Sequence, residues 1–460
     1  MQNYILTKRQ KGVRIQIVNA YKMTLCSDEL ISRRNMMELL NRKKTGKVER
    51  PVKVLQFGEG NFLRAFADYM IDIANEQGKF NGDIVLVKPI EFGSLDRFHD
   101  QECQYTVQLR GIVDGEPKRI NRIVTSVADA VDAYGEYQKY ADYAKLDSLR
   151  YIVSNTTEAG IVYDDTDRLE MEPPKSYPGK LTKFLYERYK HFNGAMDKGL
   201  VMLPVELIDD NGIHLKECVE KLAVLWNLEE GFKTWLDEAC VFTSTLVDRI
   251  VTGYPRDEAE ELCKEFGYQD NLIVTGEPFA LWVIESAKDI SKEFPLPDAG
   301  LPVIFTDNQK PYKQRKVRIL NGAHTSFVLA SYLCGNDIVL ESMQDELIFN
   351  FMKATIFDEV IPTLTLPKQD LIDFAEAVIT RFNNPYVKHA LLSISLNSVS
   401  KWRARCMPSF LEYIKNEGKL PTHLTFSLAA LMAFYTGTEI RDKALIGHRD
   451  GAEYQILDDA

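Results

Sequence analysis

The stretch KVRILNGAH (residues 316–324) brings together three side chains that can act on a carbonyl group. On a helix that turns by about 100° per residue, Lys316, Asn321 and His324 fall at about 0°, 140° and 80°, so they share one arc. Ketone reduction needs a proton donor and groups that polarise the carbonyl. A partly buried lysine has a lowered pKa and delivers and reclaims a proton near neutral pH, and an amide and an imidazole hold the developing alkoxide. Spacing alone leaves an alternative open, an Asn-Gly turn beside a solvated basic face that includes Arg315 and Arg318.

A glycine turn earlier in the chain has the setting of a nucleotide site. The apolar run 52–57 leads into Gly58 and Gly60, a helical pattern follows over 62–73, and DIVLVK (83–88) reads as a second buried strand. Strand, glycine turn, helix and strand make a βαβ unit, whose turn can cradle a pyrophosphate. The motif is imperfect, because Leu63 stands where GxGxxG has its third glycine. The candidate cofactor contacts here are Phe57, Gly58, Gly60, Asn61, Phe62 and Arg64.

The choice between NAD and NADP stays open at this turn. The acidic residue that would bind the ribose hydroxyls is not at its usual place, since the second strand ends in Lys88, and Glu91 comes slightly late. Lys88 is compatible with a 2′-phosphate. A further strand, 151–154, runs into the polar turn NTTEAG, where we expect Thr157 and Glu158 to border the nicotinamide or ribose.

The rest of the pattern predicts an α/β fold, with a Rossmann-like N-terminal nucleotide-binding domain followed by a mostly α-helical C-terminal domain. Residues 105–110 and 119–126 predict a hairpin, 200–205 a strand, and most of the chain from about 213 onward helix. The proline-rich segment 294–302 is the best candidate linker. We therefore expect an extension over 1–50, a dinucleotide-binding domain over 51–295 and a helical catalytic domain over 296–460.

Composition excludes several classes of function. A net charge of −11 disfavours general binding to nucleic acid, and no run approaches the length of a membrane helix. Seven cysteines without a CxxC pair are typical of buried thiols in a reducing compartment, so we expect a cytoplasmic protein. No ligand cluster indicates a metal site.

Several stretches together resemble one family, the long-chain polyol dehydrogenases typified by mannitol dehydrogenase. They are QFGEGNFLRAF, SNTTEAG, SYPGKLT, ELIDDNG, STLVDRIVTGYPRDE, KPYKQRKVRILNGAHT and RFNNPYVKH, and they span most of the chain after residue 52. The TEAG, ELIDxNG and VDRIVTGYPRDE pieces resemble the branch that reduces tagaturonate. The resemblance implies NADH rather than NADPH, no catalytic metal, an active site between the domains, Lys316 as general acid/base, and Asn321 and His324 as the residues that position and polarise the carbonyl.

The expected reaction is the reversible reduction of D-tagaturonate to D-altronate, a step of hexuronate catabolism. A keto acid needs a cation for its carboxylate. Arg381 is the first choice, because the resemblance implies that its stretch RFNNP lies near the active site and because its planar fork suits a carboxylate. Lys388 is a lesser candidate, followed by His389, Lys401 and Arg405.

One departure from the family concerns the oxyanion contact. Polyol-oxidising relatives carry an Asn where this chain has Leu207, so Glu206 or Asn211 is the expected replacement. The alternatives are a fructuronate or polyol oxidoreductase of the same family and a non-catalytic NAD-binding protein. The sequence does not give the oligomeric state.

Overall fold

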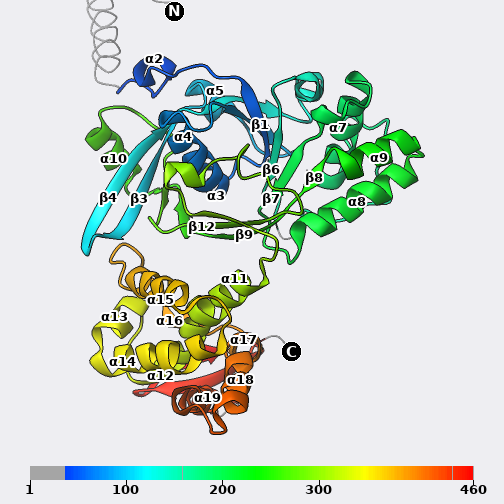
Figure 1. Cartoon of the computed structure of the whole chain (residues 1–460). Coiled ribbons are helices and arrows are strands. Elements are labelled where there is room, and N and C mark those ends of the chain that lie inside the picture. The colour runs from blue at the N-terminus through cyan, green and yellow to red at the C-terminus, as the bar shows by residue number, and fades with distance from the viewer. Residues whose placement is uncertain (1–36, 158, 438, 459–460) are drawn as a thin grey trace, which may run out of the picture.

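The structure is a computed structural model that describes residues 37–157, 159–437 and 439–458. It has an α/β body above and a helical body below, and helix α11 (Lys310–Arg315) runs from one toward the other (Figure 1). The predicted fold class, a Rossmann-like part followed by a helix-rich part, is confirmed.

A six-stranded parallel sheet forms the centre of the α/β body, with strand order β5-β2-β1-β6-β7-β8. Strand order reverses between β1 and β6, and this is the switch point at which open α/β sheets bind ligands. The strands are β1 (Val52–Phe57), β2 (Asp83–Lys88), β5 (Val127–Asp132), β6 (Tyr151–Ser154), β7 (Val201–Pro204) and β8 (Val241–Phe242).

Both faces of this sheet are covered, which explains why its strands read as continuous apolar runs. Val54 and Leu86 face the core beside α4 (Tyr69–Glu76), and the alternate residues Leu55 and Val87 face the core beneath the helices of the other side. Those helices are α6 (Tyr137–Asp142), α7 (Tyr177–His191), α8 (Asn211–Leu225) and α9 (Glu230–Glu238).

Two smaller sheets complete this body, and most of their strands lie after residue 240, where the sequence pattern predicted helix rather than strand. The predicted hairpin is present as β3 (Tyr105–Val113) and β4 (Glu116–Val124), and it joins β10 (Val251–Gly253) and β11 (Val274–Gly276) in a four-stranded sheet. A three-stranded sheet holds β9 (Ser244–Asp248), β12 (Leu281–Glu285) and β13 (Val303–Thr306). The α/β body also contains the short helices α2 (Arg42–Thr45), α5 (Asp96–Asp100) and α10 (Ala259–Phe266).

The lower body is built around α12 (Gly322–Leu333), which packs on α19 (Thr422–Phe434) and α14 (Glu346–Ala354). Its other helices are α13 (Val339–Gln344), α15 (Lys368–Phe382), α16 (Leu391–Ile394), α17 (Ser398–Arg405) and α18 (Met407–Glu417). This part is less purely helical than predicted, because β14 (Glu439–Arg441), β15 (Ala444–Arg449) and β16 (Ala452–Ile456) form an antiparallel sheet. None of the described helices is long and apolar enough to cross a membrane.

The proline-rich segment 294–302 does not behave as an exposed linker. Phe294 and Leu296 are fully buried in the core of the α/β body, and β13 follows within the sheet of that body. The division of the chain at residue 295 stays a prediction.

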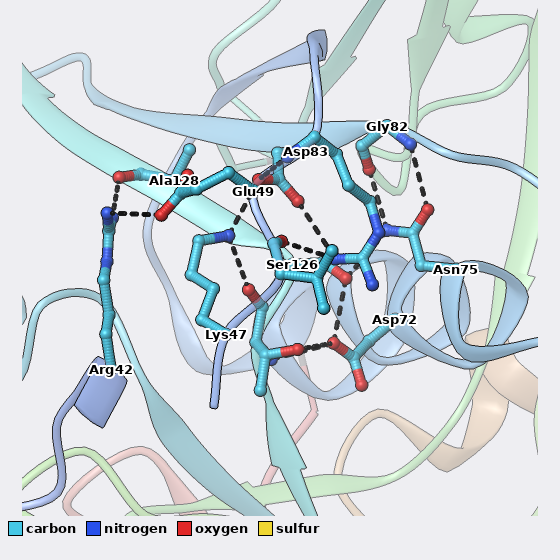
Figure 2. Close-up of polar contacts among 12 residues, drawn as sticks. Arg42, Lys47, Glu49, Asp72, Asn75, Gly82, Asp83, Ser126 and Ala128 are labelled. Carbon is cyan, nitrogen blue, oxygen red and sulfur yellow. Dashed lines mark hydrogen bonds and ion pairs between the residues drawn. The ribbon is translucent and has the colours of Figure 1, made fainter. Parts of the chain in front are cut away.

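Residues 37–50, the described part of the expected extension, are bound to the α/β body by buried polar contacts (Figure 2). Lys47 Nζ lies 2.7 Å from Asp83 Oδ2 and 2.8 Å from the backbone oxygen of Thr125, and the side chains of this ion pair are completely buried. Arg42 donates to the backbone oxygen of Ala128. Residues 1–36 lie outside the described part of the chain.

Candidate active site

The glycine turn lies at the carboxyl end of β1, where the sheet changes direction. Gly58 has φ of +113°, and a Cβ there would come within 3.0 Å of the backbone oxygen of Asn155. A Cβ on Gly60 would meet no atom within 4 Å, because this residue faces open space. That space is a cavity of about 440 Å³, which Gly58, Glu59 and Gly60 line together with Thr157. Its volume and its position at the N-terminus of α3 (Asn61–Leu63) are compatible with a pyrophosphate.

Of the two phenylalanines predicted to contact the cofactor at this turn, one lines a cavity and the other is buried in the core. Phe62 lines the neighbouring cavity and stacks on Phe66. Phe57 is buried against Tyr177, so its side chain belongs to the core.

Arg64 is turned inward rather than toward a phosphate. Its guanidinium donates to the backbone oxygen of Leu272 at 2.6 Å and to Asn61 Oδ1 at 2.7 Å, and it lies over the rings of Phe98 and Tyr105. Arg64 therefore acts on the turn by holding Asn61.

The polar turn after β6 borders the same cavity and also the larger one. Asn155 and Thr157 line both cavities. Glu206 supports this turn from below, because its carboxylate accepts hydrogen bonds from the backbone N–H of Thr156 at 3.0 Å, from the Thr156 hydroxyl at 2.9 Å and from Ser154 Oγ at 3.1 Å. Burial raises the pKa of Glu206. The predicted contact Glu158 lies outside the described residues.

Lys88 is occupied within the protein. Its ammonium lies 3.0 Å from Asp132 Oδ2 and donates to the backbone oxygens of Ile90, Glu91 and Phe92 at 3.1, 3.2 and 3.4 Å. Because the side chain is only 1% exposed, this geometry does not offer Lys88 to a 2′-phosphate.

The larger cavity, of about 670 Å³, contains Lys316. The ammonium of Lys316 donates a hydrogen bond to the backbone oxygen of Val247 at 2.7 Å. Burial lowers the pKa of Lys316 below its ordinary value, and the carboxylate of Asp248 acts in the opposite direction. This is the environment in which a lysine can exchange a proton near neutral pH.

The helix that carries Lys316 contains a π turn, η5 (Lys316–Asn321). The i→i+5 hydrogen bonding of a π turn places residues five apart one above the other, so Lys316 and Asn321 share a face more closely than α-helical angles suggest. The side chain of Asn321 has no hydrogen bond within the described part of the chain.

His324 follows on α12 and lines a small cavity beside Arg381 and His389. Its ring stacks on Phe382 with a centroid distance of 4.1 Å, and its Nε2 atom is buried without a hydrogen-bond partner. Burial, with His389 and two arginines nearby, holds the pKa of His324 well below its ordinary value. The imidazole is therefore neutral and suited to a hydrogen bond rather than to proton transfer.

Arg381 does not have the geometry expected of a free carboxylate ligand. It donates to Asp248 through Nη1 and Nη2, both at 3.1 Å, and to Glu277 through Nε at 2.9 Å and Nη2 at 2.7 Å. These four bonds use four of the five N–H donors of the guanidinium. In this arrangement a bidentate bond to a substrate carboxylate would have to displace Asp248 or Glu277, and the role expected of Arg381 stays a prediction.

Glu206 and Asn211, the two residues expected to replace the oxyanion contact, both form hydrogen bonds within the protein. The amide nitrogen of Asn211 donates to the backbone oxygens of Pro204 and Glu206 at 3.1 Å each, and its oxygen accepts from the backbone N–H of Thr245 at 2.9 Å. Asn211 thus ties β7 to β9. Leu207 is 68% exposed and lines the large cavity.

Lys388 is exposed, and no hydrogen bond or ion pair of the described residues uses its ammonium. Among the described residues, no group of three or more His, Cys, Asp or Glu side chains could hold a metal ion.

The sequence did not predict that the end of strand β9 belongs to the site. Val247, Asp248 and the following Arg249 line the large cavity beside Lys316. The guanidinium of Arg249 donates to the backbone oxygens of Phe279 and Pro278 at 3.0 Å each. The signal lies in the stretch STLVDRIVTGYPRDE, one of those that carry the family resemblance.

Comparison with known proteins supports the resemblance over most of the chain. The mannitol dehydrogenase Rossmann domain matches residues 52–297, and the mannitol dehydrogenase C-terminal domain matches residues 308–455. The altronate oxidoreductase of Yersinia enterocolitica is 46% identical over 425 residues, which is 92% of this chain and 86% of that protein. The altronate oxidoreductase of Bacteroides thetaiotaomicron is 44% identical over 92% of this chain and 88% of that protein.

Solved structures share the fold at lower identity. A substrate-free D-sorbitol dehydrogenase has a TM-score of 0.75 at 21% identity, over 91% of this chain and 88% of that one. The ternary complex of Pseudomonas fluorescens mannitol 2-dehydrogenase with NAD and D-mannitol has a TM-score of 0.65 at 22% identity, over 92% of this chain and 87% of that one. Because the two family models together cover most of the residues and curated members are nearly half identical, the chain belongs to the mannitol dehydrogenase family.

Proposed function

We propose that this protein is an NAD-dependent oxidoreductase that interconverts D-tagaturonate and D-altronate, with Lys316 as the general acid/base. One observation carries the chemistry: the cavity at the glycine turn and the cavity that contains Lys316 share Asn155, Thr157 and Ala159. A nucleotide held at the turn can therefore extend toward the lysine. The choice of substrate rests on the relatives, which are altronate oxidoreductases.

The cofactor assignment follows from the turn and from Lys88. Gly58 and Gly60 let the backbone approach a pyrophosphate, and the buried contacts of Lys88 do not offer its ammonium to the extra phosphate of NADP. Bound NADH supplies the hydride that adds to the carbonyl carbon. Lys316 gives its proton to the carbonyl oxygen as the C=O double bond becomes C–O–H, and it takes the proton back in the reverse reaction.

Asn321 and His324 are proposed to hold the carbonyl oxygen and its neighbouring hydroxyl groups. Both have hydrogen-bonding atoms that the described residues leave unused, and the neutral imidazole does not compete with Lys316 for the proton. Lys388 remains the proposed partner of the substrate carboxylate, since Arg381 is paired. The cytoplasmic location expected from the sequence stays a prediction.

The test is NADH absorbance with purified protein and tagaturonate, for the wild type and for Lys316→Met. We expect rapid NADH oxidation by the wild type and a loss of about 10²- to 10⁴-fold in kcat for the variant, the contribution typical of a general acid. Lys313→Met is the matched control, because Lys313 lies on the adjoining helix and its ammonium pairs with Asp209 on the surface.

Other outcomes decide between the alternatives. Turnover of fructuronate or fructose in place of tagaturonate would keep the family and change the substrate. NADH binding without turnover of any keto acid or ketose would indicate a non-catalytic NAD-binding protein.

A further inference from the structure

Arg381 joins the two bodies through a buried three-residue ion cluster. It lies in the last turn of α15, Asp248 ends β9, and Glu277 follows β11. The side chains of these residues are 5%, 9% and 3% exposed, in that order. The guanidinium also lies 4.2 Å from the ring centroid of Phe279. Such a planar, doubly paired cation fixes the positions of both carboxylates.

Asp248 is at the same time a neighbour of Lys316. Both line the large cavity, and the ammonium of Lys316 bonds to the backbone oxygen of Val247, the residue before Asp248. Yet Lys316 forms no ion pair with any described residue, while both carboxylate oxygens of Asp248 accept from Arg381. A mostly buried lysine beside a carboxylate would ordinarily pair with it, so a competing cation must prevent the contact.

We propose that Arg381 is a positioning residue: its two hydrogen bonds to Asp248 keep that carboxylate from pairing with Lys316, and so leave the lysine free to exchange a proton with the substrate. The inference rests on the proposed role of Lys316. A lysine paired directly with a carboxylate would hold its proton strongly and would be a poor base in alcohol oxidation. Electrostatics agree, since Arg381 lowers the pKa of Lys316 and Asp248 raises it.

Most of the other charged groups near this helix are engaged elsewhere, although the Nε atom of Arg315 is buried without a hydrogen-bond partner. Arg249 donates to backbone oxygens, and Arg405 on α17 donates to Thr325 Oγ1 at 3.3 Å. Arg315 on α11 lies under the ring of Phe374. Glu277 is held by Arg381. Asp248 is thus the carboxylate whose placement decides the state of Lys316.

The test is the pH profile of kcat/KM in both directions for Arg381→Met. With its partner gone, Asp248 should pair with Lys316 and raise the apparent pKa by about one unit or more. Alcohol oxidation needs the neutral lysine, so its profile should move to higher pH and its rate near neutral pH should fall about tenfold. Ketone reduction needs the protonated lysine, so its activity should persist to higher pH.

Three variants separate this role from a structural one. The double variant Asp248→Asn, Arg381→Met removes the carboxylate, and its apparent pKa should return to the wild-type value or below. Glu277→Gln disturbs the other half of the cluster and leaves the Asp248 bonds in place, so the apparent pKa should stay unchanged. Arg381→Lys keeps a cation beside Asp248 and should give an intermediate shift, which serves if Arg381→Met does not fold.

A folded Arg381→Met variant with the wild-type pH profile would overturn the inference, and so would a double variant shifted as far as the single one. Thermal unfolding and NADH binding identify which variants are folded. If the wild type turns over a different ketone, the proposed substrate fails, and the same comparison with that ketone still tests Arg381.

Discussion

Lys388 is the residue on which the recognition of an acidic substrate is predicted to depend. Its ammonium has no partner among the described residues, and it lies one residue from His389, which lines the cavity of His324. Lys388→Met should raise the KM for tagaturonate about tenfold, the effect of one lost charge-assisted hydrogen bond. The KM for a neutral ketose such as fructose should not change.

Lys368→Met is a suitable control, since Lys368 is an exposed lysine at the far end of α15 from Arg381. Equal effects of Lys388→Met on acidic and neutral substrates would exclude the carboxylate role.

For single residues, the sequence indicated which side-chain chemistry was present better than it indicated which groups each side chain would bond to. The type and spacing of Lys316, Asn321 and His324 were compatible with acid–base chemistry but also with an Asn-Gly turn beside a solvated basic face, and the family resemblance decided between the two. The type of Arg381 suggested a carboxylate, and the structure supplies two from within the chain, Asp248 and Glu277. They are 133 and 104 residues away in sequence, so no local pattern could reveal them.

The glycine turn is the element on which cofactor binding is predicted to depend. Gly58→Ala should lower the free energy of unfolding by about 1–3 kcal/mol, because φ of +113° is strained for alanine and its Cβ would crowd the Asn155 carbonyl. The displaced turn should also weaken NADH binding, which fluorescence titration measures.

Gly46→Ala is the matched control. Gly46 also has positive φ, +63°, but a Cβ there meets no atom within 4 Å and lies away from the cavity. It should cost about 1 kcal/mol and leave NADH affinity unchanged. Unaltered NADH binding by folded Gly58→Ala would show that the turn does not approach the cofactor.

Elements were predictable where the local pattern is strong. The βαβ unit and the hairpin carry clear apolar periods and glycine turns. Strands β9 to β13 were missed because they lie among segments with helical character. The π turn η5 was not predicted, because residues 316–324 were interpreted with the regular angles of an α-helix.

For the whole molecule, the Arg381 cluster and the bond from Lys316 to Val247 link the two bodies at the site itself. The nucleotide turn comes from the upper body and the acid–base lysine from the helix that begins the lower one (Figure 1). The relative placement of the bodies therefore sets both the distance of the lysine from the cofactor cavity and the pairing of Asp248.

The integrity of the α/β body is predicted to depend on a segment that the sequence assigned to an extension. Lys47→Met should remove the partner of the buried Asp83 carboxylate and lower the free energy of unfolding by about 3 kcal/mol at neutral pH. Burial already raises the pKa of Asp83, and Lys47 opposes that rise. In the variant, the folded state therefore binds the Asp83 proton more tightly than the unfolded state does, so stability increases as pH falls through the folded-state pKa.

Denaturant unfolding at neutral and mildly acidic pH measures this effect, and the deficit of Lys47→Met should shrink at the lower pH. The double variant Lys47→Met, Asp83→Asn removes the buried carboxylate together with its lysine partner and should recover most of the loss without a pH dependence. Equal stability of wild type and Lys47→Met would mean that Arg50, which lies 3.5 Å from the other Asp83 oxygen, neutralises the carboxylate by itself. The contribution of the extension to the fold would then come from Arg50 rather than from Lys47.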